Sequence, residues 1–168
     1  MKVRIKKLHD DAVIPKYAKD GDAGMDLTAV DVIADEGTIT YKTGIAVEIP
    51  RWHVGLLFPR SSVYKTGQTL TNCVGVIDSG YRGEIMLKYT LSPYQRDYDI
   101  GDRVGQLIII PYPRIDFVEV EELTETDRGS GGYGSTGDQL ICLKSSKVKH
   151  RRYNSMRIRM RTFALEPL

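Results

Sequence analysis

Cysteine is scarce in this chain. Its 168 residues include two cysteines, Cys73 and Cys142, and neither belongs to a CxxC pair or lies beside a histidine cluster. The spacing therefore predicts neither a zinc site nor a disulfide framework. A chain of this length can bury a core without such links. The composition favours one domain of ordinary size in a reducing, cytoplasmic environment.

Long apolar runs are also missing. No stretch reaches the length that spans a membrane, and Met1–Leu8 is too charged for the apolar part of a signal peptide. Basic residues are in deficit over residues 1–137, which hold 16 Lys and Arg against 20 Asp and Glu, whereas residues 138–168 hold 8 against 2. Because phosphate contacts need clustered cations, the acidic body argues against a nucleic-acid groove. Neither a membrane nor a nucleic acid is therefore an expected partner of the body.

No segment keeps a helical period over a long stretch. Short apolar or alternating runs of strand length recur instead, with turn-forming clusters between them. The runs are Lys2–Lys6, Ile45–Ile49, Val54–Phe58, Glu84–Leu91, Val104–Ile110 and Ile115–Val120. The turn clusters are Asp20–Asp22, Asp35–Gly37 and Asp99–Asp102. This pattern predicts an all-β sandwich or barrel with at most one short helix.

Two local patterns refine this expectation. Within Glu84–Leu91, the side chains of Ile85, Leu87 and Tyr89 fall on one face, which is the period of a half-buried strand. The one helical candidate follows Pro59-Arg60-Ser61-Ser62. Either serine is expected to cap that turn and leave backbone N–H groups free.

The segment Gly75–Ile85 reads as an apolar strand, a polar turn and a returning strand, which predicts a β-hairpin. Its turn carries Asp78 and Tyr81. A carboxylate at the mouth of a hairpin can orient and deprotonate a water molecule, and an adjacent ring can pack against a sugar or base. An Asp in a turn more often bonds its own backbone, and a Tyr in a strand more often serves packing. The residues alone leave both interpretations open.

Glycine is concentrated in Arg128–Gly137, where it supplies five of ten residues. Glycine lets backbone N–H groups approach phosphate oxygens closely, and Arg128, Ser135 and Thr136 add donors. The segment lacks the Gly-Lys-Ser/Thr ending of a P-loop, and its GxGxxG match does not open a helix, so neither motif applies. A flexible linker is the alternative that the composition favours.

Five segments, in order along the chain, resemble the five motifs of the trimeric dUTPase family. They are Ala23–Leu27, Pro59–Ser62, Gly75–Gly83, Gly101–Leu107 and Arg128–Gly137. Each segment is weak alone, but five in order, within a stretch from about Val3 to Gly137, are a specific signal. Two departures are mild: Tyr133 stands where the family usually has Phe, and Gly105 stands where Ala is common.

The resemblance implies hydrolysis of dUTP to dUMP and pyrophosphate, which keeps uracil out of DNA and supplies dUMP for thymidylate synthesis. Asp78 is similar to the family's general base, which aligns a water molecule for attack on the α-phosphorus. The implied cofactor is Mg²⁺, held mainly by the triphosphate, with Asp26 contacting its water shell. The implied phosphate contacts are Arg60, Ser61, Ser62 and Gln106.

The resemblance also assigns the groups that select a uracil deoxynucleotide. Tyr81 is implied to lie beneath the deoxyribose, where its ring excludes a 2′-hydroxyl group. The residues implied to surround uracil are Asn72, Val76, Ile77 and Met86. The glycine-rich segment is implied to close over the nucleotide as a lid. Its substrate contacts are Arg128, Tyr133, Gly134, Ser135 and Thr136.

The predicted organisation is a β-domain over residues 1–127, the lid over residues 128–137 and a basic extension over residues 138–168. The family builds three sites from three subunits, so the resemblance implies a homotrimer. The extension interleaves basic residues with aromatic ones such as Tyr153 and Phe163, a mixture that can bind nucleic acid or an acidic partner. A poorly ordered extension without a role in turnover is the favoured interpretation.

Two other functions stay open at this point. A dCTP deaminase is similar to dUTPases in fold and has a similar Arg-Ser-Ser segment, but Asp78, Tyr81 and the glycine-rich segment favour the hydrolase. A regulatory or binding protein on the same scaffold is the second alternative, because a fold does not fix a function.

Overall fold

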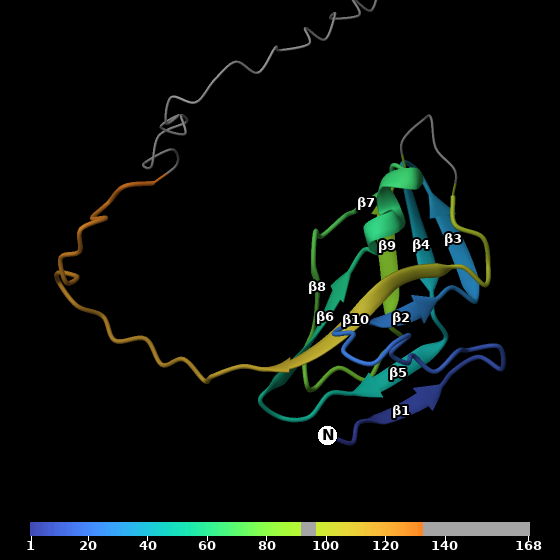
Figure 1. Cartoon of the computed structure of the whole chain (residues 1–168), viewed down its shortest axis with the longest axis horizontal. Helices are drawn as coiled ribbons and strands as arrows, with labels where there is room; N and C mark the ends of the chain where they lie inside the picture. Colours follow the sequence, from blue (N-terminus) through green and yellow to red (C-terminus); the bar gives the residue numbers. More distant parts are fainter. Residues whose placement is uncertain (92–96, 133–168) are drawn as a thin grey trace, which may run out of the picture. The chain divides into compact units, whose positions relative to one another are not determined.

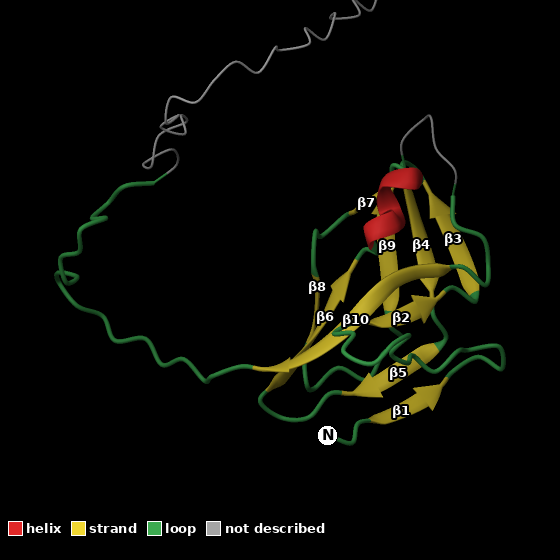
Figure 2. Cartoon of the chain, viewed as in Figure 1, coloured by secondary structure: helices red, strands yellow, loops and turns green. Residues whose placement is uncertain are grey.

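The computed structural model describes residues 1–91 and 97–132 (Figure 1). The chain divides into two units, Met1–Val118 and Glu119–Leu168. Strands make up nearly all of the regular structure, with one short 3-10 helix, η1 (Ser61–Lys65), in the described part (Figure 2). No described helix has the length and apolar character needed to cross a membrane. The predicted all-β class with at most one short helix is confirmed.

In the described part of the chain, ten strands build three antiparallel sheets. They are β1 (Arg4–Lys7), β2 (Met25–Thr28), β3 (Asp31–Asp35), β4 (Thr38–Lys42), β5 (Ile45–Glu48), β6 (His53–Phe58), β7 (Thr69–Leu70), β8 (Gly75–Ile77), β9 (Met86–Thr90) and β10 (Arg103–Pro111). One four-stranded sheet has the order β2-β10-β6-β8, and the other has the order β3-β4-β9-β7. Strands β1 and β5 form a separate pair. Segments far apart in the sequence therefore become neighbours, as β2 and β10 show.

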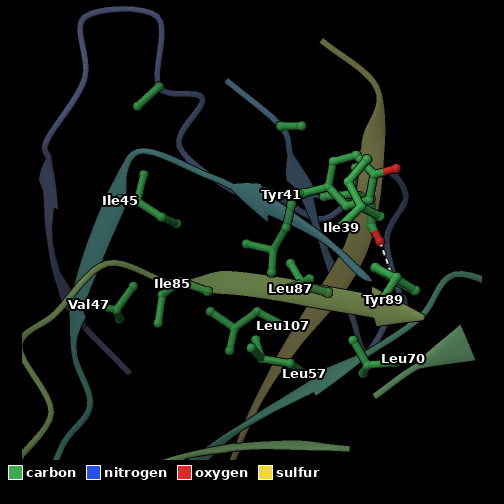
Figure 3. Packing of buried hydrophobic residues seen from close by; sticks show 14 of the residues in the cluster. Ile39, Tyr41, Ile45, Val47, Leu57, Leu70, Ile85, Leu87, Tyr89 and Leu107 are labelled. Carbon is green, nitrogen blue, oxygen red and sulfur yellow. Dashed lines mark hydrogen bonds between the residues drawn. The ribbon is translucent and has the colours of Figure 1, made fainter. Parts of the chain in front are cut away.

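One apolar core joins side chains from all three sheets (Figure 3). The alternation predicted around β9 is confirmed, because Ile85, Leu87 and Tyr89 are each at most 1% exposed. Tyr41 of β4 packs edge-on against Tyr89, with ring centroids 5.8 Å apart. Such edge-to-face packing adds to the hydrophobic stabilisation of buried rings. The core fixes the strand ends on which the candidate site residues lie.

The three predicted turn clusters are confirmed as turns. Gly21, Gly37 and Gly101 all have positive φ angles, between 69° and 93°. Glycine adopts this backbone region without a steric penalty, which explains its place in each cluster.

Three of the predictions from sequence are wrong. Ile115–Val120 forms no strand, and its Phe117 side chain is 95% exposed, because no segment of the described chain pairs with it. Gly75–Ile85 is not a paired hairpin, because β8 belongs to one sheet and the following strand, β9, belongs to the other. Neither serine caps η1, whose N-cap residue is Arg60 without a side-chain hydrogen bond to the backbone.

Candidate functional site

Asp26 and Gln106 are brought together by the pairing of β2 with β10. The two residues are direct partners in the antiparallel register. Leu27 of β2 is fully buried, so the neighbouring Asp26 points to the other face of the strand. The Nε2 atom of Gln106 donates a hydrogen bond to Oδ1 of Asp26 over 3.2 Å.

Arg60 reaches the same carboxylate from the end of β6. Phe58 of β6 pairs with Gln106, so the chain leaves this strand close to Asp26. The Nε atom of Arg60 donates to Oδ1 of Asp26 over 3.0 Å. Its other nitrogen, Nη1, lies 3.5 Å from the hydroxyl oxygen of Ser62. Four of the predicted phosphate and metal-shell residues, from three separate segments, thus share one cluster.

Arg103 completes this cluster, although the sequence motif that contains it did not indicate this contact. Its Nη1 atom donates to Oδ2 of Asp26 over 3.0 Å. Residues 103 and 106 would face opposite sides of a regular strand, because side chains alternate. The register of β10 against β2 shifts between Arg103 and Gly105. This bulge places Val104 and Gly105 both inward and turns Arg103 toward the side of Gln106.

The cluster of Asp26, Arg60, Arg103 and Gln106 suits an anionic ligand. Two guanidinium groups face one carboxylate, which leaves the cluster with a net positive charge. Arg60 is only partly exposed, with 24% of its side chain accessible. A planar guanidinium group in such a place matches the geometry of phosphate oxygens. Ser61, at the surface beside Arg60, has an exposed hydroxyl side chain.

Asp78 lies directly after β8, which pairs with β6 through Val76 and Ile77. Its backbone carbonyl accepts a hydrogen bond from the N–H of Tyr81 over 3.1 Å. Within residues 1–91 and 97–132, its carboxylate has neither a hydrogen bond nor an ion pair. The Asp78 side chain therefore does not cap its own turn, and it is free to act on a ligand.

The surroundings of Asp78 include two residues that were not predicted from the sequence. Asp78 lines a hollow of about 390 Å³ together with Val54, Val76, Ser79 and the two unpredicted residues, His53 and Tyr112. These two cap the far end of the β6–β10 ladder, where Pro111 pairs with His53. No motif marks them in the sequence, because only the strand register brings them to the turn.

Tyr81 is held in place at the turn. Its hydroxyl donates to the backbone carbonyl of Glu84 over 3.0 Å. A Cβ atom on Gly83 would overlap its ring, so a glycine at this position lets the ring approach the backbone closely. The ring remains 40% exposed and presents a face that a sugar can pack against.

The predicted uracil-binding residues do not all lie together in one chain. Asn72 and Met86 line a hollow of about 440 Å³, whereas Val76 lines the hollow of Asp78 and is 61% exposed. Ile77 packs against the core from its edge. No hydrogen bond or ion pair of the described residues joins Asp78 to the Asp26 cluster.

Arg128 belongs to the second unit, Glu119–Leu168. Its Nε atom donates to the carbonyl of Gly131 over 3.1 Å, and the N–H of Gly131 donates back to the carbonyl of Arg128 over 3.1 Å. Tyr133, Gly134, Ser135 and Thr136 lie outside the described residues. The described part also contains no group of three or more His, Cys, Asp or Glu side chains that could hold a metal ion by themselves.

The fold and these two features define the class: an all-β protein with an arginine-rich cluster around one carboxylate and, among the described residues, an unpaired carboxylate at a separate turn. The family model for dUTPase matches residues 10–137. The chain therefore belongs to the dUTPase family, as its five motifs predicted.

Known relatives agree with this assignment. A deoxyuridine 5'-triphosphate nucleotidohydrolase of Hydrogenobaculum sp. is 41% identical over 142 residues, which are 82% of this chain and 99% of that protein. One of Thermobifida fusca is 42% identical over 82% of this chain and 79% of its own. Among solved structures, the Staphylococcus bacteriophage 80alpha dUTPase with dUpNHpp has a TM-score of 0.70 and 27% identity, covering 81% of this chain and 98% of the phage chain. A phage phi11 dUTPase, described with a structural Mg(II) ion, has a TM-score of 0.61 and 27% identity over 73% of this chain and 98% of its own.

Proposed function

We propose that the chain hydrolyses dUTP to dUMP and pyrophosphate, and so keeps uracil out of DNA while supplying dUMP for thymidylate synthesis. The observation that carries this proposal is the contrast between two acids. The carboxylate of Asp26 is engaged by three side chains, whereas the carboxylate of Asp78 has no partner in the described part of the chain. An engaged acid suits binding, and a free acid suits proton transfer.

Asp78 is the proposed general base. It takes a proton from a water molecule as the water oxygen bonds to the α-phosphorus. The bond from the α-phosphorus to the oxygen that bridges it to the β-phosphate then breaks, and pyrophosphate leaves. Water is the nucleophile, so the protein needs no activated Ser or Cys.

The proposed phosphate contacts are Arg60, Ser61, Ser62 and Gln106. Their fixed donors neutralise the charge that develops on the α- and β-phosphates, which is electrostatic stabilisation rather than covalent chemistry. The proposed lid, residues 128–137, adds contacts to the γ-phosphate and to the base. These contacts come from Arg128, Tyr133, Gly134, Ser135 and Thr136.

The proposed selectivity for uracil comes from the turn after β8 and its neighbours. Backbone donors and acceptors near Asn72 and Ile77 are proposed to pair with the polar edge of uracil. Cytosine has a different pattern of donors and acceptors, so these backbone groups would be left buried and unpaired when it enters. The segment that follows β8 is proposed to lack space for the methyl group of thymine. Tyr81, fixed by its bond to Glu84, excludes the 2′-hydroxyl group of a ribonucleotide.

Mg²⁺ is the proposed cofactor, and the carboxylate oxygens of Asp26 are suited to contact its water shell. Oδ1 of Asp26 accepts two hydrogen bonds and Oδ2 accepts one, which leaves room on Oδ2 for a water molecule. One acid with room for water fits an ion that keeps several waters and is carried mainly by phosphates. When bound, the ion would neutralise phosphate charge, and Asp26 would orient its water shell.

A homotrimer in a cytoplasmic setting completes the proposal. Within residues 1–91 and 97–132, no hydrogen bond or ion pair joins Asp78 to the Asp26 cluster, and we propose that a second copy of the chain supplies the missing part of the site. Large apolar side chains such as Phe117 and Val118 are 95% and 81% exposed, as expected of a surface that other subunits cover. Light scattering would give a mass three times that of the 18.9 kDa chain, and a monomer mass would contradict the trimer.

One assay tests the activity. The protein is incubated with dUTP, dCTP, UTP or dTTP, with Mg²⁺ or with a chelator, and pyrophosphate and ammonia are measured. The proposal requires Mg²⁺-dependent pyrophosphate from dUTP and much less from the other three. Ammonia from dCTP would indicate the deaminase instead, and no product from any nucleotide would indicate a binding protein.

A further inference from the structure

A buried amide side chain, Gln68, lies between η1 and β7. It is only 4% exposed, although glutamine is a residue that usually lies at the surface. A buried polar side chain is stable only when its donors and acceptors are paired. The partners of Gln68 therefore indicate what this residue is for.

Gln68 joins two other segments at one buried point. Its Nε2 atom donates to the hydroxyl oxygen of Tyr41 over 2.9 Å and to Oδ1 of Asp97 over 2.9 Å. The same hydroxyl oxygen accepts the backbone N–H of Tyr98 over 3.1 Å. Both hydrogens of the amide are thus used, and β4 is tied to the segment that follows residue 96.

The network continues into η1, the turn after Arg60. The backbone N–H of Gln68 donates to the Oγ1 atom of Thr66 over 3.2 Å, and this hydroxyl donates to the carbonyl of Val63 over 2.7 Å. The N–H of Val63 donates to the carbonyl of Arg60 over 2.9 Å. Gln68 is therefore linked by three successive hydrogen bonds to the residue that contacts Asp26.

The other end of the network leads to β10. From Tyr98 the chain enters the Asp99–Asp102 turn, in which the N–H of Asp99 donates to Oδ2 of Asp102 over 3.0 Å. The next residue is Arg103, whose guanidinium group also contacts Asp26. The network thus joins the two segments that supply Arg60 and Arg103 of the Asp26 cluster.

We propose that Gln68 and Tyr41 are positioning residues for dUTP hydrolysis. They set the place of η1, and with it Arg60, Ser61 and Ser62, relative to Arg103 and Gln106. This inference rests on the proposed role of those side chains as phosphate contacts. Neither positioning residue touches the nucleotide.

The test is a Gln68→Met variant, which keeps a side chain of similar length and the backbone hydrogen bond to Thr66 but removes the side-chain hydrogen bonds to Tyr41 and Asp97. Small misplacements of groups that act on a transition state reduce the rate by about tenfold to a hundredfold. The expected result is a kcat loss for dUTP of that size with a much smaller change in KM, because the misplaced contacts are strongest in the transition state. Tyr41→Phe, which removes one hydroxyl group, is the second variant and should show the same split.

Thr43→Val is the matched control, since Thr43 is 1% exposed and its hydroxyl donates to the carbonyl of Ile85 over 2.6 Å, away from η1. The Thr43→Val variant should have a lower free energy of unfolding than the wild-type protein and an unchanged kcat. The inference is overturned if Gln68→Met and Tyr41→Phe keep the wild-type kcat, or if the control loses kcat equally. It is also overturned if neither variant folds, because the network would then serve the fold alone. An inactive wild-type protein would refute the proposed function instead, so the two failures are distinguishable.

Discussion

The Nε atom of Arg60 lies 3.0 Å from Oδ1 of Asp26, although 34 residues separate the two in the sequence. The pair is partly buried, with 24% of the arginine and 15% of the aspartate side chain exposed. A charged hydrogen bond of this kind fixes the direction in which the rest of the guanidinium group points. Asp26 thus aims Arg60 at the place where an anion would bind.

Arg60→Ala should therefore reduce the stabilisation of the transition state more than it reduces the free energy of unfolding. Loss of one fixed donor to a developing charge reduces kcat/KM by about a hundredfold to a thousandfold. Steady-state rates with dUTP measure this loss. Arg4→Ala is the control, because Arg4 forms a surface ion pair with Glu48 and is 84% exposed. Equal losses in both variants would contradict a specific role of Arg60.

Asp78→Asn should keep nucleotide affinity and lose hydrolysis, because the amide has the shape of the carboxylate but cannot accept the proton from water. Removal of a general base lowers kcat by about 10² to 10⁴. Calorimetry with the imido analogue dUpNHpp measures affinity, and pyrophosphate release measures kcat. Asp116→Asn, at an exposed ion pair with Arg114, should leave both values unchanged. Undiminished turnover of the Asp78 variant would remove the base from the mechanism.

The period of the core strands could be predicted because it is local. The alternation through Ile85, Leu87 and Tyr89 depends only on which side chains are apolar, and burial follows it. Ile115–Val120 has a similar composition, yet forms no strand. A strand exists only when another segment pairs with it, and the sequence of one segment does not contain that information.

The site was predicted only in part, because a short motif also carries only local information. Short motifs marked Asp26, Arg60 and Gln106, and the structure gathers them. Arg103 was missed because its direction depends on a bulge in β10, which the local sequence does not reveal. The separate sheets of β8 and β9 were missed because turn residues predict that a chain reverses, not which strands then pair.

Deletion of residues 139–168 should leave dUTP turnover nearly unchanged. The five motifs end at Gly137, and the residues beyond it carry the +6 charge of the basic extension. The expected kcat and KM are those of the full chain, measured on a protein of confirmed mass. A folded, correctly assembled truncation without activity would show that the extension takes part in the reaction.

Alkaline pH should destabilise the fold through the buried tyrosines. Burial raises the pKa of Tyr41 and of Tyr98 above the ordinary value of 10.0. The unfolded chain loses these protons near pH 10, so the free energy of unfolding is undiminished below that pH and falls as the pH rises toward the folded pKa values. Urea unfolding on both sides of pH 10 measures the slope.

Tyr98→Phe should reduce this alkaline slope. The Tyr98 hydroxyl is buried without a hydrogen-bond partner among the described residues, so its removal leaves no group unpaired at neutral pH. Tyr64→Phe is the control, because Tyr64 is 75% exposed. If both variants keep the wild-type slope, ionisation of the tyrosine cluster is not the cause of the alkaline loss.

Gly105→Ala should destabilise the fold. A Cβ atom on Gly105 would overlap Cδ2 of Leu87 and lie 3.0 Å from the carbonyl oxygen of Phe58. Overpacking of a core costs about 1–3 kcal/mol. Urea midpoints measure the loss, and Gly80→Ala is the control because a Cβ atom there meets open space. Leu87→Val in the Gly105→Ala background should recover part of the loss, since the overlap is with the Leu87 side chain, and strictly additive losses in the double variant would contradict this packing.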